Sequence, residues 1–191
     1  MSETVKRPIT AEDLYKFNLV SSARISPDGK HIIYAVHRVD EKTEKKYSNL
    51  WIADTDGQHP PRQFTFGDQN DASPRWAPDG SAITFLSNRG DKEKPAQVYL
   101  ISLAGGEARS LTSIQGAIGA VAWSPDGTRL ALTVRKTDAD VLEREKDEQK
   151  KKLGTVVRHY DRLFYKLDGY GYLPKERWHL WVVNAENGEA Q

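Results

Sequence analysis

The 191-residue chain has no cysteine, a single methionine and a formal net charge of only +1. Without cysteine, it cannot form a disulfide framework, a thiol nucleophile or a zinc site with cysteine ligands. The near-zero net charge argues against bulk electrostatic capture of nucleic acid. Apolar runs such as residues 32–36 fall far short of the roughly 18 residues that a membrane span needs. We therefore expect neither nucleic acid nor a membrane as a partner.

The chain also lacks a targeting signal and the common catalytic motifs. Residues 1–8 contain no apolar core of the kind found in signal peptides, so a cytoplasmic location is expected. There is no G-x-S-x-G nucleophile elbow, Walker loop, G-x-G-x-x-G or H-E-x-x-H. We therefore expect no catalytic, cofactor-binding or metal-binding residues, and no cofactor, in this chain alone.

What the chain does contain is an internal repeat. A Pro-Asp-Gly turn occurs three times, with prolines 51 and then 47 residues apart, at residues 27–29, 78–80 and 125–127. An alternating apolar strand follows each turn, at residues 31–36, 82–86 and 129–134. A second shared strand comes later in each copy, at residues 49–54, 97–102 and 179–184. Three aligned copies make this a strong signal of a repeat architecture.

The turn chemistry indicates how the strands connect. Proline sets the first corner of a tight turn, aspartate caps its own backbone, and glycine takes the positive φ that closes a hairpin. Four strands joined by such turns form an antiparallel meander of about 48 residues, which is the size of a β-propeller blade. The sequence therefore predicts an all-β fold: a β-propeller of four-stranded antiparallel blades, about three of them present and the ring incomplete.

The repeat also sets the expected boundaries. We expect an N-terminal arm with a short helix, then three blades, at residues 1–19, 20–66, 67–112 and 113–191. The last strand of blade three is expected to be missing. Thr10 and Asp13 are a plausible capping pair for the short helix. Blade three carries about 34 residues more than the repeat requires, an insertion at about 138–174 that opens with an expected helix over 138–153.

The second half of the insertion is the one place that suggests a substrate role. Basic and aromatic side chains alternate there, and five of them are candidates for a substrate gate: Arg158, Arg162, Tyr165, Tyr170 and Tyr172. Such groups could hold a peptide through charge-assisted and aromatic contacts. Two alternatives stay open. The aromatic rings could pack the loop against its own blade, and the stretch could form a nucleic-acid surface.

Other conspicuous residues have structural explanations. Trp76 and Trp123 precede their turns and fit packing between blades. Ser26 and Ser124 sit beside the turns and are interpreted as turn hydroxyls rather than nucleophiles. The five histidines are dispersed along the chain, and Asp68 with Asp71 looks like a pair of loop carboxylates.

The Ser-Pro-Asp-Gly blades resemble the propeller repeats of TolB-type proteins and of the prolyl oligopeptidase family of serine peptidases. Two further segments resemble the acylaminoacyl peptidase and dipeptidyl aminopeptidase branch of that family. One runs from Ile9-Thr10-Ala11-Glu12-Asp13-Leu14 into the first Ser-Pro-Asp-Gly turn. The other is the end of the insertion, residues 162–172, followed by the strand at 179–183.

This resemblance implies that the chain is one part of a larger peptidase. In the family, a propeller caps an α/β-hydrolase domain that carries Ser, Asp and His, and filters substrates. No triad residue carries over, because the matching motifs are absent here. We expect a non-catalytic propeller segment of a cytoplasmic serine peptidase for short or N-blocked peptides, which would meet its peptide substrate through the missing catalytic domain. The alternative is a stand-alone TolB-like scaffold that binds protein partners. Uncovered outer blades lead us to expect self-association.

Overall fold

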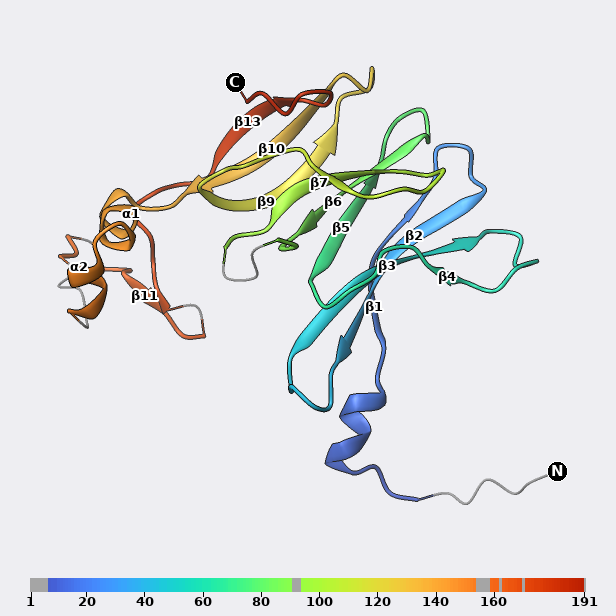
Figure 1. The fold of residues 1–191 in the computed structure, drawn as a ribbon, viewed down its shortest axis with the longest axis horizontal. Coiled ribbons are helices and arrows are strands. Elements are labelled where there is room, and N and C mark those ends of the chain that lie inside the picture. Colours follow the sequence, from blue (N-terminus) through green and yellow to red (C-terminus); the bar gives the residue numbers. More distant parts are fainter. Residues whose placement is uncertain (1–6, 91–93, 154–158, 162, 170, 191) are drawn as a thin grey trace.

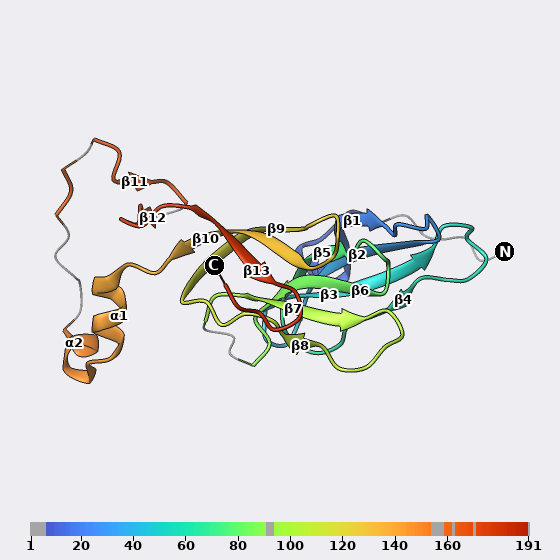
Figure 2. The same ribbon diagram turned by 90° about the horizontal axis from the view of Figure 1, so that it is seen from above.

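The computed structural model describes residues 7–90, 94–153, 159–161, 163–169 and 171–190. Three antiparallel sheets of three or four strands follow one another in chain order (Figure 1), and a two-stranded sheet lies within the described part of the insertion. A segment inserted in the third sheet projects away from the sheets, as Figure 2 shows from above. The sheets thus form an open row rather than a closed ring.

Each of the first two sheets is a four-stranded meander, and we call them blade one and blade two. Blade one contains β1 (Leu19–Ile25), β2 (His31–Val39), β3 (Lys46–Asp54) and β4 (Arg62–Gln63). Blade two contains β5 (Asp71–Trp76), β6 (Ala82–Ser87), β7 (Gln97–Ser102) and β8 (Arg109–Ser110). In both, the strand order across the sheet is the order along the chain.

The third sheet, blade three, has three strands. They are β9 (Gly116–Trp123), β10 (Arg129–Lys136) and β13 (His179–Asn184), in the order β13-β10-β9. An isolated antiparallel bridge joins Val183 to Ala190, at the edge where a fourth strand would pair. The predicted all-β propeller fold with an incomplete set of blades is confirmed.

The Pro-Asp-Gly turns join the first two strands of every blade, as the repeat predicts. Gly29, Gly80 and Gly127 have φ values of +74°, +74° and +70°. Each glycine amide donates to the carbonyl three residues earlier, at 2.9–3.0 Å. The hydroxyls of Ser26 and Ser124 each donate to the aspartate of their own turn at 2.6 Å. These serines therefore stabilise turns, in agreement with the sequence-based interpretation.

Two apolar clusters hold adjacent blades together. The cluster between blades one and two contains Ile33, Ala35, Leu50, Ile52, Phe64, Trp76, Ile83, Phe85 and Ile101. The cluster between blades two and three contains Leu86, Val98, Leu111, Val121, Leu130, Leu132, Val134 and Val183. Trp76 is only 8% exposed, and its Nε1 donates to the carbonyl of Arg24 in blade one at 3.0 Å. The expected packing of tryptophan between blades is confirmed at Trp76, and Trp123 packs against the second cluster.

The outer blades each leave apolar side chains exposed in the described part of the chain. On blade one, Val20 and Ile25 are 62% and 64% exposed, and they pair with Val36 and Ile32 on one face of the sheet. On blade three, Leu180 is 72% exposed. We call these surfaces the free faces of blades one and three.

The short N-terminal helix is present as a 3-10 helix, η1 (Ala11–Lys16). Thr10 and Asp13 form the expected capping box, in which the Thr10 amide donates to the Asp13 carboxylate at 2.9 Å. Arg7 and Lys16 also pair with Asp13. These contacts, led by that of Arg7, hold the pKa of the Asp13 carboxyl well below its usual range.

The prediction of one helix over 138–153 is wrong, because two short helices occupy that stretch. They are α1 (Ala139–Glu145) and α2 (Glu148–Lys152). Asp147 has an extended backbone, and its carboxylate accepts hydrogen bonds from the amides of Gln149 and Lys150 at 2.9 and 3.1 Å. An aspartate that caps a second helix interrupts the first. A two-stranded hairpin, β11 (Lys166–Leu167) and β12 (Gly171–Tyr172), follows later in the insertion.

Candidate functional site

The insertion leaves blade three after β10, returns to it before β13, and is closed at its base. The two carboxylate oxygens of Asp138 accept hydrogen bonds from the amides of Lys175 and Glu176 at 3.0 and 2.9 Å. The Nζ of Lys175 also lies 3.4 Å from a carboxylate oxygen of Asp140. We call residues 138–140 and 175–176 the neck. The neck ties the start of the insertion to its end.

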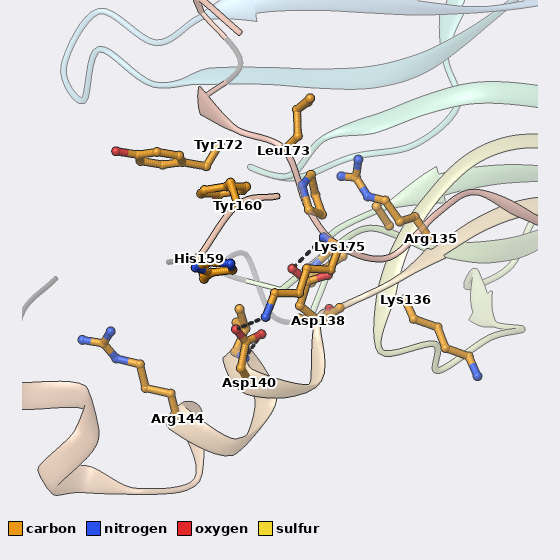
Figure 3. A pocket seen from close by; sticks show the side chains of 15 residues that line it. Arg135, Lys136, Asp138, Asp140, Arg144, His159, Tyr160, Tyr172, Leu173 and Lys175 are labelled. Carbon is orange, nitrogen blue, oxygen red and sulfur yellow. Dashed lines mark hydrogen bonds and ion pairs between the residues drawn. The ribbon is translucent and has the colours of Figure 1, made fainter. Parts of the chain in front are cut away.

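A cavity of about 550 Å³ lies beside the neck. Its lining comes mainly from the end of β10, from α1 and from residues 159–160 and 172–175 of the insertion (Figure 3), and Pro95 and Ala117 complete it. The side chains labelled there are Arg135, Lys136, Asp138, Asp140, Arg144, His159, Tyr160, Tyr172, Leu173 and Lys175. The cavity therefore lies where the insertion meets blade three.

Three tyrosines form an aromatic wall on the insertion side. The ring centroids of Tyr160 and Tyr172 are 5.9 Å apart with an interplanar angle of 12°. Tyr165 lies 5.2 Å from Tyr160 and 6.4 Å from Tyr172. The Leu173 amide donates to the Tyr165 carbonyl at 2.8 Å, which holds the hairpin strands together. Of the three tyrosines, Tyr160 and Tyr172 line the cavity itself.

The lining carries more positive than negative charge. Four lysine or arginine residues and two aspartates line the cavity, which leaves a formal excess of two positive charges. Both carboxylates are engaged within the insertion: Asp138 by the two neck amides, and Asp140 by the Val141 amide and by Lys175. The guanidinium of Arg135 lies 5.0 Å from the Trp178 ring centroid. A cavity of this composition favours an anionic group.

Two of the five gate candidates lie in the described part of the chain, and the structure brings them together. Tyr172 lines the cavity, and Tyr165 packs against it in the aromatic wall. Tyr172 also has the Nζ of Lys166 at 5.4 Å from its ring centroid. The other three candidates, Arg158, Arg162 and Tyr170, lie outside the described residues.

Several cavity residues are not among those candidates. His159 and Tyr160 do lie in the stretch where basic and aromatic side chains alternate, so that pattern could have found them. Lys175 lies one residue beyond the expected end of the insertion. It meets Asp138, 37 residues earlier in the chain, and no local pattern reports such a contact.

Asp71 is not the loop carboxylate that the sequence suggests. It begins β5 and is completely buried. The Nη2 of Arg89 and the Oγ of Ser87 each donate to its carboxylate at 2.6 Å. In the repeat register, the cross-strand pair of Asp71 and Ser87 corresponds to valine pairs or isoleucine–valine pairs in the other blades. An aspartate at an apolar repeat position is the signal that could have revealed this ion pair.

Two histidines that are apart in the sequence contact the same aspartate. The Nδ1 atoms of His31 and His59 each lie 2.9 Å from a different carboxylate oxygen of Asp54. These contacts, led by that of His59, lower the pKa of the Asp54 carboxyl. Among the described residues, no group of three or more His, Cys, Asp or Glu side chains is arranged to hold a metal ion. None of the described helices combines the length and apolar character needed to cross a membrane.

The meanders, the turns between them and the packing between sheets define a β-propeller. The TolB beta propeller domain family matches residues 31–143, and the chain belongs to that family. Its sequence is 35% identical over 189 residues to the uncharacterized peptidase YuxL of Bacillus subtilis, covering 97% of this chain and 27% of YuxL. It is 38% identical over 82 residues to dipeptidyl-peptidase 5 of Porphyromonas gingivalis, covering 43% of this chain and 12% of that protein.

A solved structure shows the same fold. The acylaminoacyl peptidase of Pyrococcus horikoshii superposes with a TM-score of 0.67 at 21% identity, over 92% of this chain and 25% of that one. The expected resemblance to the propeller part of prolyl oligopeptidase family peptidases is confirmed. The chain spans about a quarter of the length of YuxL.

Proposed function

We propose that this chain is the propeller part of a cytoplasmic serine peptidase for short or N-blocked peptides, and that its insertion controls substrate access. The cavity between the insertion and blade three carries the proposal, because it joins an aromatic wall to a few charged groups. Binding sites for small ligands typically have this composition. Since the chain has no nucleophile motif, we place hydrolysis in a hydrolase domain outside it.

The gate works through the connection of the insertion to the blade. The insertion is tied at its neck and projects beyond the sheets (Figure 2). A projecting loop with one fixed base can admit short peptides and obstruct long ones. We assign the contact with peptide to Tyr165 and Tyr172, together with Arg158, Arg162 and Tyr170.

The test uses the full-length protein that contains this chain. Tyr172→Ala and Arg162→Ala should change kcat/KM for peptides of different lengths by different factors, because they alter the gate and not the chemistry. Leu163→Ala is the matched control, since Leu163 belongs to the insertion, is 86% exposed and does not line the cavity. An unchanged kcat/KM at every peptide length, together with a lower melting temperature, would assign the insertion a structural role and contradict the gate.

A stand-alone scaffold that binds protein partners is the second candidate function. The match to the TolB beta propeller domain family favours it. The two candidates differ in what the complete reading frame encodes: a G-x-S-x-G motif downstream supports the peptidase, and further blades alone support the scaffold. Hydrolysis of a peptide by the full-length protein, abolished by replacing that serine, would exclude a pure scaffold.

We also propose that the 191-residue chain self-associates. The exposed apolar side chains on the free faces of blades one and three support this proposal, because such surfaces are buried between blades elsewhere in the chain. Light scattering should give a mass that rises with concentration, and a constant monomeric mass would contradict self-association.

The proposed cytoplasmic location rests on the sequence alone, and cell fractionation tests it.

A further inference from the structure

We infer that the cavity beside the neck binds the C-terminal carboxylate of a peptide, with Lys175 as its principal cation. The inference rests on the proposed function, and it names the part of the substrate that the site recognises. Four features of the described residues support it: the placement of Lys175, the pairing of the nearby carboxylates, the surrounding charge and the aromatic wall.

Lys175 is held in place by the neck. Asp138 binds the amides of Lys175 and Glu176, so two consecutive backbone positions are anchored where the side chain begins. The ammonium group lies 3.4 Å from Asp140, and its side chain is 67% exposed. An ammonium has three donors. One long contact to Asp140 therefore leaves donors of Lys175 for an incoming oxygen.

The surrounding charge favours an anion as the ligand. Asp138 uses both of its carboxylate oxygens on neck amides, and Asp140 accepts from the Val141 amide at 3.0 Å as well as facing Lys175. Basic residues exceed acidic ones by two in the lining, and of the basic ones Lys136 directs its ammonium to the Trp181 ring, away from the cavity (Figure 3). The guanidinium of Arg135, another lining residue, lies 5.0 Å from the Trp178 ring centroid. A bound carboxylate would offset part of this positive charge.

The size and the aromatic wall point to the end of a peptide. A volume of about 550 Å³ lies within the range of sites for small ligands. The nearly parallel rings of Tyr160 and Tyr172 offer a flat surface for the side chain next to the carboxylate. A free C-terminus is the one anionic group that every unmodified linear peptide carries, whatever its sequence. The cavity would then select short peptides by their end rather than by an internal residue.

The decisive experiment measures binding to the unmodified 191-residue chain. Isothermal titration calorimetry compares the tripeptide Ala-Ala-Phe with the same tripeptide amidated at its C-terminus. We expect the acid to bind about tenfold more tightly or better, the effect of one charge-assisted hydrogen bond. Equal affinity for acid and amide would overturn the inference. So would inorganic phosphate that binds the cavity while the acid and amide do not differ, because the site would then be a general anion site.

Variants assign the effect to Lys175. Lys175→Met should abolish the preference for the acid, and Lys175→Arg should retain it because the charge is kept. Lys152→Met is the matched control: it removes the same charge from the same insertion, at an exposed residue of α2 outside the cavity. Loss of the preference in Lys152→Met, or its survival in a folded Lys175→Met, would contradict the assignment. Circular dichroism checks folding, and the acid–amide comparison on the unmodified chain decides the inference if a variant does not fold.

The binding result is independent of the gate. If this chain prefers the acid, but the gate variants of the full-length protein change kcat/KM equally at every peptide length, the carboxylate site is supported and the gate is contradicted. The reverse combination would retain the gate and remove the carboxylate site.

Discussion

The buried ion pair in blade two allows a strong prediction about stability. Asp71 is fully buried, whereas the side chain of Arg89 is 24% exposed and lies over the rings of Phe85 and Tyr99 at 5.0 and 5.4 Å. Arg89→Leu would leave the Asp71 carboxylate buried with Ser87 as its nearest donor. Breaking a buried pair in this way typically costs about 3–5 kcal/mol. We expect a loss of about 3 kcal/mol, because water reaches the Arg89 side of the pair.

Replacing Arg89 and replacing Asp71 should reduce the free energy of unfolding by different amounts. Asp71→Asn keeps an oxygen that accepts from Ser87, and it leaves a charge on Arg89 that water can hydrate. We therefore expect a smaller cost for Asp71→Asn, about 1–2 kcal/mol. The triple variant Asp71→Val, Ser87→Val, Arg89→Leu recreates the Val20–Val36 pair of blade one. It removes the buried charge and both of its partners, so it should be more stable than Arg89→Leu alone.

Urea unfolding followed by tryptophan fluorescence measures these differences. The titrations are repeated at several protein concentrations, because self-association would raise the apparent stability. A cost below about 1 kcal/mol for Arg89→Leu would show that the buried carboxylate finds other partners. A triple variant that is less stable than Arg89→Leu would refute the reasoning from the repeat register.

Three further predictions concern the turns and the blade interface. Gly127→Val should destabilise by more than about 1 kcal/mol, since its φ of +70° strains a β-branched residue, and an unchanged melting temperature would contradict the hairpin assignment. Asp126 has its pKa lowered from 3.8 to about 2, chiefly by the Ser124 hydroxyl, so its contribution to stability is complete above about pH 5 and is lost as the pH falls through about 2. The free energy of unfolding should therefore fall less steeply between pH 5 and pH 2 in Asp126→Asn than in the unmodified chain. Identical slopes of unfolding free energy against pH would argue against this linkage. Trp76→Phe should cost about 1 kcal/mol more than Trp123→Phe. Of these two indole N–H groups, that of Trp76 has a hydrogen-bond partner among the described residues and that of Trp123 has none. Equal melting temperatures for these two variants would contradict that account.

Most of the fold could be predicted from the sequence because its signals are local. Pro27-Asp28-Gly29 and its two later copies specify tight turns through backbone preferences that act within four residues. The strands between them alternate with a period of two, which a single strand already displays. A repeat of about 48 residues then fixes the number of strands in each sheet, and the resemblance to propeller peptidases follows from the same turns.

The site depended on tertiary structure, because its contacts join residues that local rules do not relate. Asp138 and Lys175 form the neck across 37 residues of chain, and Asp147 divides the expected helix through a capping bond that competes with helix continuation. The burial of Asp71 leaves only an indirect trace in the sequence, an aspartate at an apolar repeat position, and its pairing with Arg89 is decided by packing. Local propensities act over a few residues, whereas burial and charge pairing are decided only when distant segments pack together.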